Sequence, residues 1–280
     1  MKEEYLLKEK IAAEGLMHTA WAGKTLYYYE TTDSTNVRAK QEAERNAPHG
    51  ALFVADEQTA GRGRRGRAWQ SPAGRNLYFT LLLRPGVAVD KASMLTLVMA
   101  LAVAEGIGGV LRKEGREASL RPGIKWPNDI VLDGRKVCGI LTEMSLEPEQ
   151  NGIQYVIIGA GINVGKQEFP KELLDKAVSL EELLGAPLSR SRLLADIMQS
   201  FERHYEAFLK CQDLTYLREE YEAMLVNYGR AVRVLEPGGG FDGVARGITN
   251  TGELLVERPD GSVQRVYAGE VSVRGIYGYV

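Results

Sequence analysis

The chain has 280 residues and a formal net charge of −2, with 44% hydrophobic and 26% charged residues. This composition is that of an ordinary globular protein, built from one large domain or from a large domain with a small companion. A slightly acidic chain argues against general nucleic-acid binding, which favours a basic domain. Two cysteines without a paired spacing argue against a disulfide framework or a cysteine zinc site.

The N-terminal region carries no targeting signal. MKEEYLLKEK is charged and lacks the apolar region of a signal peptide. The apolar run LTLVMALAVAEG stops at Glu105, short of the length that crosses a membrane. We therefore expect a cytoplasmic protein with no membrane segment. Lys2 to Leu16 is predicted to form one short helix, and residues 1–24 are too few for a helix-turn-helix module.

The next stretch predicts strands and a helix in alternation. TLYYYE is rich in strand formers, and TTDSTN, residues 31–36, is a cluster of helix-capping residues ahead of the helical VRAKQEAERN. Capping explains one residue of this cluster, but not six polar residues in a row. ALFVADEQ is a strand that ends at Gln58, and NLYFTLLLRP is apolar enough to be a central strand.

A loop with four arginines and three glycines, ADEQTAGRGRRGRAW, lies between these two strands. Glycines free the backbone, and arginines offer charged forks suited to carboxylate and phosphate. We expect the loop to be mobile without a ligand and to order over an anionic one. The loop alone leaves other interpretations open: a solvated basic turn, an RGG-like nucleic-acid tether or a nucleotide-hydrolase phosphate loop. The last of these lacks its lysine and hydroxyl residue, which Arg67 and Ala68 replace.

A lysine stands out in the middle of the chain. SMLTLVMALAVAEGI predicts a buried helix, and residues 108–122 are polar and predicted to lie at the surface. In the following GIKWPNDIVLDGRKVCGILTEM, two short strands flank a turn, and a hairpin forms at Asp133. Lys125 lies on the first of these strands, where a buried ammonium is costly unless an anion meets it. We therefore favour a walled anion site over a strand-edge lysine with its head in water.

QYVIIGAGINVG predicts an apolar strand that ends in a glycine turn, residues 159–165. A dinucleotide-binding interpretation is weak, because the glycines come late in the chain and KQEFPKELL follows them. The predicted turn exposes backbone amides at a strand end and places Asn163 to contact a base or sugar. Residues 171–227 carry helical patterns.

Beyond Tyr228 the pattern changes to short alternating strands with three turn signals, EPGGGFDG, ITNTGE and RPDGS. This pattern predicts a small all-β barrel that forms a separate lobe. We divide the chain into an N-terminal segment, a main domain and a β domain, at residues 1–24, 25–227 and 228–280.

Five motifs in this order after the STN cluster resemble those of biotin protein ligases: GRGRRGRAW, SPAGRNLYFT, KWPNDI, GILTE and GAGIN. The similarity runs from about Leu26 to the C-terminus and includes the GEVSVR ending. It implies an α+β fold, with a mixed-sheet catalytic domain of the biotin/lipoate ligase type and a small C-terminal SH3-like β-barrel domain. It also implies two steps. Biotin and Mg-ATP form biotinyl-5′-AMP, and biotin then passes to one lysine of a biotin carboxyl carrier domain, usually of acetyl-CoA carboxylase or pyruvate carboxylase.

The resemblance also implies roles for individual residues. The catalytic pair is Lys125 and Arg64, whose positive charge joins two mutually repelling anions, the biotin carboxylate and the α-phosphate. The implied biotin-binding positions are Ser34, Thr35, Asn36, Gln58, Gly61, Arg62, Gly63, Arg64, Trp69, Tyr78, Lys125, Gly159 and Gly161. The implied nucleotide-binding positions are Arg64, Lys125, Asn163, Arg233 and Arg274. ATP implies Mg²⁺, and the sequence names no ligand for it.

The adenylate is a mixed anhydride that water destroys, so the loop is expected to close over it, with biotin binding before ATP. Many relatives carry an N-terminal winged helix-turn-helix and double as repressors. With only residues 1–24 ahead of the main domain, we expect the monofunctional type and no DNA binding. Related enzymes often pair through the central sheet, so a homodimer is also expected. The alternatives are a lipoate-type ligase of the same fold and a DNA-binding, biotin-responsive regulator.

Overall fold

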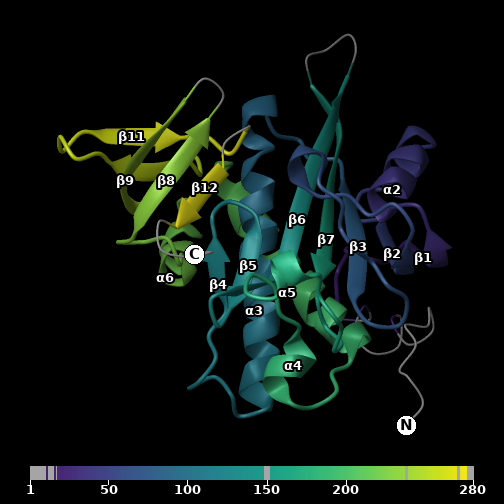
Figure 1. Cartoon of the computed structure of the whole chain (residues 1–280). Helices are drawn as coiled ribbons and strands as arrows, with labels where there is room; N and C mark the ends of the chain where they lie inside the picture. Colours follow the sequence, from purple (N-terminus) through teal and green to yellow (C-terminus); the bar gives the residue numbers. More distant parts are fainter. Residues whose placement is uncertain are drawn as a thin grey trace.

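The structure is a computed structural model that describes residues 11, 16, 18–147, 152–236, 239–269 and 272–275. The helix predicted between Lys2 and Leu16 lies almost wholly outside these residues. Within the described part, the strands form one sheet of seven and one sheet of five, with helices on both faces of the larger sheet (Figure 1). The predicted α+β fold, a mixed-sheet domain followed by a small β domain, is confirmed.

The larger sheet has the order β1-β2-β3-β7-β6-β5-β4. Its strands are β1 (Leu26–Thr32), β2 (Leu52–Gln58), β3 (Leu77–Leu83), β4 (Gly123–Lys125), β5 (Asp129–Leu132), β6 (Arg135–Leu146) and β7 (Ile153–Ile162). Only the β1–β2 pair is parallel among the described strands, and every other pair in the order is antiparallel. All residues of β3 are buried, as its continuous apolar run predicts.

The parallel pair explains where the polar cluster lies. Parallel strands need a crossover, and α2 (Thr35–Glu44) supplies it between β1 and β2. The small face of α2, with Ala39 and Ala43, packs with Phe53 and Ile157 in a core of its own. The start of α2 and the end of β2 therefore meet at one edge of the sheet.

The opposite face of the sheet is covered by α3 (Met94–Lys113), which follows the short η3 (Val89–Lys91), and by α5 (Arg190–Cys211) (Figure 1). The sequence predicted that this helix ends near Ile107 and that polar surface follows, but α3 continues for another turn and a half. The stretch Val89–Lys113 is long and apolar enough to cross a membrane, contrary to the expectation from sequence, and 72% of its most apolar window is buried inside the molecule. Such burial is typical of the core helix of a globular domain.

The region predicted to be helical after β7 contains four elements: η4 (Lys171–Leu173), α4 (Leu180–Leu184), α5 and α6 (Arg218–Met224). The prediction of a glycine turn at residues 159–165 is wrong, because β7 continues to Ile162. Gly159 and Gly161 lie inside β7, and each pairs with a residue on both neighbouring strands. These glycines therefore leave the face of the sheet without side chains at two positions and do not form a turn.

The smaller sheet is antiparallel, in the order β11-β10-β9-β8-β12. Its strands are β8 (Ala231–Glu236), β9 (Gly239–Ile248), β10 (Leu254–Glu257), β11 (Val263–Val266) and β12 (Ser272–Gly275). Two predicted turns, ITNTGE and RPDGS, lie between strands as expected. The third signal, EPGGGFDG, was placed too broadly, because its last residues already belong to β9.

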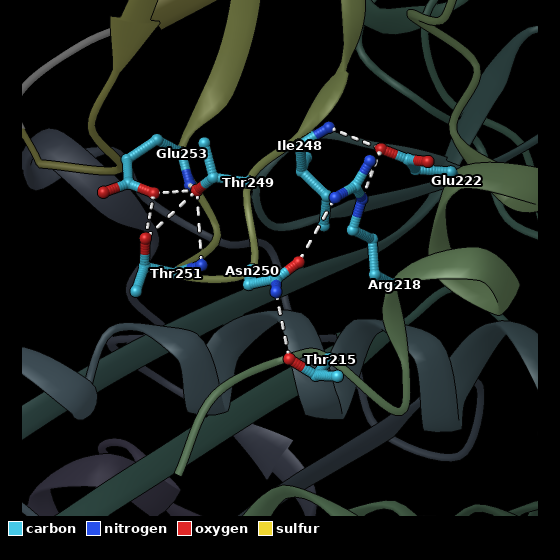
Figure 2. Close-up of polar contacts among 8 residues, drawn as sticks. All are labelled: Thr215, Arg218, Glu222, Ile248, Thr249, Asn250, Thr251 and Glu253. Atoms are coloured by element: carbon cyan, nitrogen blue, oxygen red, sulfur yellow. Dashed lines mark hydrogen bonds and ion pairs between the residues drawn. The ribbon is translucent and has the colours of Figure 1, made fainter. Parts of the chain in front are cut away.

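Polar contacts fix the smaller sheet against the helices that precede it. Figure 2 shows Asn250 donating to the Thr215 hydroxyl at 3.0 Å, and Arg218 donating to the Asn250 side-chain oxygen at 3.2 Å. The Glu222 carboxylate accepts the backbone N–H of Ile248 at 2.9 Å.

The Trp126 indole adds a further contact between the smaller sheet and the larger domain. The Trp126 indole N–H donates to the carbonyl of Gly252 at 2.9 Å. Trp126 belongs to the KWPND segment, so the smaller sheet is held directly beside that segment. This contact brings the C-terminal part of the chain to the edge of the larger sheet where Lys125 lies.

Candidate active site

The polar cluster at the start of α2 is buried and organised by Gln58. Gln58 Oε1 accepts the backbone N–H of Thr35 at 2.9 Å and its hydroxyl at 3.2 Å, while Gln58 Nε2 donates to Ser71 Oγ at 3.0 Å. Ser34 occupies the N-cap position, but its side chain makes no capping hydrogen bond. The cluster is therefore more than a helix cap, as six polar residues in a row suggested.

Asn36 extends this network across the sheet. Its amide nitrogen donates to Glu143 Oε2 at 2.8 Å, and its oxygen accepts the Thr80 hydroxyl at 2.6 Å. A side-chain carbon at Gly159 would collide with Asn36 Oδ1, so only glycine lets Asn36 lie flat on β7. The nitrogen and the oxygen of the amide thus both have hydrogen-bond partners, which hold the side chain in one orientation.

The arginine loop folds back on itself between Gln58 and Ser71, which are joined by a β-bridge. The Gly63 N–H donates to the Arg67 carbonyl at 2.8 Å. The tip is the short η2 (Arg64–Gly66), where Arg65 adopts a left-handed φ of 59°. The expected mobility of this loop without a ligand stays a prediction.

Arg64 joins three parts of the chain. Its Nη1 donates to Asn128 Oδ1 at 2.7 Å, and its Nη2 donates to the carbonyls of Ala268 and Gly269 at 3.3 and 2.7 Å. Burial lowers the pKa of this guanidinium, and the nearby Asp129 carboxylate opposes that shift. The loop is therefore tied both to the KWPND segment and to the smaller sheet.

Trp69 lies across two facing glycines. Gly139 on β6 pairs directly with Gly161 on β7. A Cβ at Gly139 would lie 3.0 Å from the indole ring, and one at Gly161 would collide with the indole nitrogen. The indole N–H is buried and has no hydrogen-bond partner among the described residues. The ring thus lies on bare backbone with one donor left unused.

These groups enclose a narrow cavity of about 50 Å³. Two larger hollows border it. One of about 940 Å³ shares Gln58 and Trp69 with the cavity, and one of about 590 Å³ shares Arg64 and Asn128. Ligand pockets usually hold about 300–1,000 Å³. The cavity is therefore closed in this conformation, and a ligand of ordinary size requires the loop or the indole to move.

Lys125 ends β4 at the other side of Asn128 and is 7% exposed, as the buried-strand prediction required. Its pKa is lowered to about 8, chiefly because burial disfavours the charged form. Asp129 opposes this shift, while Lys136, Arg274 and Arg67 add to it. The surroundings of Lys125 are therefore strongly cationic.

The cavity therefore has a polar end, an aromatic ring on glycine backbone, and a cationic end under an arginine loop. Comparisons with known proteins show which family this chain resembles. The family model "Biotin/lipoate A/B protein ligase family" matches residues 28–163, and "Biotin protein ligase C terminal domain" matches residues 228–274. The bifunctional ligase/repressor BirA of Bacillus subtilis is 37% identical over 92% of this chain and 76% of its own length. The chain belongs to the biotin protein ligase family.

Two further relatives support the assignment along most of the chain. The biotin–[acetyl-CoA-carboxylase] ligase of Paracoccus denitrificans is 34% identical over 87% of this chain and 98% of its own length. Among solved structures, the biotin protein ligase from Aquifex aeolicus in complex with biotin and ATP has a TM-score of 0.76 at 30% identity. The similarity covers 90% of this chain and 99% of the Aquifex chain.

The positions that the family resemblance singled out fall into two groups. Most of them line the narrow cavity: Ser34, Thr35, Asn36, Gln58, Arg62, Gly63, Arg64, Trp69, Gly159 and Gly161. The other three, Gly61, Tyr78 and Lys125, do not line it. Gly61 faces the 940 Å³ hollow, and Tyr78 is buried in β3 with its hydroxyl donating to the Pro72 carbonyl at 3.2 Å. Tyr78 thus braces the base of the arginine loop.

Of the positions predicted to bind the nucleotide, Arg64 lines the cavity, whereas Lys125, Asn163, Arg233 and Arg274 do not. Asn163 follows β7 and donates its backbone N–H to the Val137 carbonyl at 2.8 Å. Arg233 and Arg274 are directly opposite each other on β8 and β12. Arg233 is exposed and holds Asp242 with two hydrogen bonds of 2.6 and 2.7 Å. Arg274 is close enough to affect the pKa of Lys125.

Several residues in or beside this candidate site were missed from the sequence: Thr80, Asn128, Asp129, Lys136, Gly139 and Glu143. Two of them had a visible signal. Thr80 is a hydroxyl residue inside an otherwise apolar strand, and Gly139 interrupts VCGIL, where a strand interior disfavours glycine. The others depend on which strands become neighbours, and the local pattern does not give that.

Proposed function

We propose that this chain is an ATP-dependent biotin ligase, which forms biotinyl-5′-AMP and transfers biotin to a lysine of a carboxyl carrier domain. The observation that carries the proposal is the cavity itself. A buried polar end and a cationic end are joined by an aromatic ring over glycines, beneath a loop of arginines. The family membership of the chain supports the same activity.

The polar end suits the ureido ring of biotin, a compact set of donors and acceptors on an otherwise apolar molecule. Thr35, Asn36 and Gln58 offer both kinds of group, and their own hydrogen bonds fix their orientation before a ligand arrives. Pre-set polar groups of this kind reject a molecule that cannot pair with them. The indole of Trp69 then covers the apolar part of the ligand.

The cationic end suits the chemistry of the first step. The biotin carboxylate attacks the α-phosphate of ATP and pyrophosphate leaves, so two anions must approach each other. We assign Lys125 and Arg64 to this task, because both are partly or fully withdrawn from water and both lie close enough to Asp129 and Arg67 for these charges to affect their pKa values. The same closed loop protects the adenylate from hydrolysis.

Asp129 does not fit a magnesium site. A protein ligand for Mg²⁺ needs a carboxylate that is available to the cation. Asp129 meets the Lys136 ammonium at 2.6 Å and stands among several other cations. We propose that Mg²⁺ arrives on the phosphates of ATP and assign it no side chain.

The remaining proposals concern organisation and partners. We propose residues 25–227 as the catalytic domain and residues 228–280 as the β domain. Asn163, Arg233 and Arg274 are proposed to serve the nucleotide, in which case the exposed Arg233–Asp242 pair has to share its arginine with the triphosphate. The carrier domain and a homodimer are proposed on the resemblance. A cytoplasmic location is proposed from the two cysteines without a paired spacing, and the lack of DNA binding from the slightly acidic net charge. A gel shift with operator DNA tests the regulator alternative.

The decisive experiment is ATP–pyrophosphate exchange with purified protein, supplied with biotin, lipoate or no acid. We expect exchange with biotin alone. A purified carrier domain should then gain one biotin per molecule, measured by intact-mass spectrometry. Exchange that depends on lipoate would replace biotin as the substrate, and the absence of exchange with any acid would refute the adenylation chemistry.

A further inference from the structure

Three neighbouring strands bring a second lysine next to Lys125. Lys125 on β4 is directly opposite Asp129 on β5. Lys136, near the start of β6, places its ammonium 2.6 Å from Asp129 Oδ1. The same oxygen accepts the side-chain N–H of Asn128 at 3.1 Å. One carboxylate, held in place by Asn128, therefore lies between two lysines.

The Lys136 ammonium points over the cavity rather than into solvent. It lines the cavity wall and lies 5.2 Å from the centre of the Trp69 ring. A Cβ at Gly139 would be 2.8 Å from Nζ, so the bare backbone there makes room for the ammonium. The Lys136 side chain is 23% exposed. Its partner Asp129 is only 17% exposed, so both members of this ion pair are largely withdrawn from water.

The backbone around Lys136 is fixed on the proposed nucleotide side. Its N–H donates to the Lys176 carbonyl at 2.7 Å, and its carbonyl accepts the Val178 N–H at 3.0 Å. The next residue, Val137, accepts the N–H of Asn163. Lys136 is thus held between the ring that covers the biotin cavity and the segment that follows β7.

Several cations lie close to this point. Among the described residues, the largest charge effects on the pKa of Lys125 come from one carboxylate, Asp129, and three cations, Lys136, Arg274 and Arg67. A partly buried surplus of positive charge is unfavourable by itself, and an anion stabilises it. A phosphate group has the charge and the acceptor oxygens to do so.

We propose that Lys136 is a second ammonium of the site, which contacts a phosphate of the nucleoside triphosphate beside Lys125, and that Asp129 is the positioning residue that holds it there. This inference rests on the proposed function. In the absence of the triphosphate, Asp129 keeps Lys136 aimed over the cavity. When the triphosphate binds, the phosphate shares the ammonium with Asp129, and no bond is made or broken by either residue.

The test compares charge with shape in the full-length protein. Lys136→Met keeps most of the side-chain length without the charge, Lys136→Arg keeps the charge, and Asp129→Asn keeps the shape of the carboxylate. Lys113→Met is the matched control, because Lys113 also meets one carboxylate, Asp196 at 2.9 Å, on the far helices. The measurements are KM for ATP and for biotin in pyrophosphate exchange, the pH profile of exchange, and the thermal midpoint.

Loss of a charged hydrogen bond to phosphate should raise KM for ATP about tenfold or more in Lys136→Met, with less change in KM for biotin. Lys136→Arg should recover part of this loss. Asp129→Asn should move the alkaline limb of the profile to lower pH, since Asp129 favours the charged form of Lys125.

Each other outcome overturns the proposal. If Lys136→Met changes stability but leaves KM for ATP as in Lys113→Met, the lysine is only structural. If Lys136→Met does not fold, Asp129→Asn provides the test. The positioning role is rejected if Asp129→Asn leaves the alkaline limb of the pH profile unmoved, or if it leaves KM for ATP unchanged. Active wild-type protein with insensitive variants refutes this inference alone, whereas wild-type protein without biotin-dependent exchange refutes the proposed function as well.

Discussion

The buried ion pair beneath the arginine loop offers a sharp test of how the site is supported. Arg190, at the start of α5, is 5% exposed and meets the Asp56 carboxylate, 9% exposed, at 2.8 Å. The same guanidinium donates to the Asn76 carbonyl at 3.0 Å, and Asp56 Oδ2 accepts the Gly74 N–H at 2.8 Å. The pair thus joins α5, β2 and the segment that leads from the loop into β3.

Asp56→Ala removes the opposite charge from a buried guanidinium. Breaking a buried pair in this way costs about 3–5 kcal/mol of unfolding free energy, because the desolvated charge loses its compensation. For a protein of this size, that corresponds to a fall in the thermal midpoint of roughly 6–20 °C. Urea unfolding followed by circular dichroism measures the free energy, and scanning fluorimetry measures the midpoint.

The same helix provides the control. Arg192 forms an exposed pair with Asp196 at 3.2 Å, and Arg192→Ala should cost about 0–1 kcal/mol. If Asp56→Ala and Arg192→Ala lower stability equally, burial of the ion pair is not what stabilises this region, and the reasoning from desolvation is wrong.

Three further predictions concern activity. Arg64→Gly should release biotinyl-5′-AMP and so label lysines of a bystander protein, and an unlabelled bystander beside a variant that still consumes ATP would contradict the role of Arg64. Gly161→Ala should raise KM for biotin about tenfold, since its Cβ displaces the Trp69 indole, whereas Gly86→Ala, with open space around it, should not. Biotin-dependent exchange should fall as pH rises through about 8, because the Lys125 ammonium is lost there rather than near 10.5. Lys125→Arg should flatten that fall if it remains active, and a wild-type rate that stays constant from pH 7 to 10 would contradict the assignment.

Much of the fold followed from local patterns. The polar run ahead of an amphipathic helix predicted the start of α2, and the strand ending at Gln58 delivered that side chain to the same edge of the sheet. The buried strand around Lys125 was predicted because apolar residues flank a charge that is costly to bury. These features depend on neighbours in sequence, so the sequence alone was enough.

The position of the glycines was not predictable in the same way. Gly159 and Gly161 looked like a turn because glycine favours turns, yet both lie in β7 with extended backbone. Their lack of a side chain is explained only by Asn36 and Trp69, which come from distant parts of the chain and lie on them. A one-dimensional pattern does not contain that contact, so local propensity gave the wrong element.

The contacts of Arg64 explain why the two sheets have to be considered together. The guanidinium lies in the arginine loop, but its acceptors are Asn128 of the larger domain and the carbonyls of Ala268 and Gly269 beside the smaller sheet. Because both ends of one rigid fork are engaged, moving the loop requires both sets of hydrogen bonds to be exchanged. The hydrogen bond from Trp126 to Gly252 holds the smaller sheet in a position where the Arg64 guanidinium can donate to those carbonyls. The closed cavity is therefore a property of the whole chain, since neither domain alone supplies every partner of the arginine that covers it.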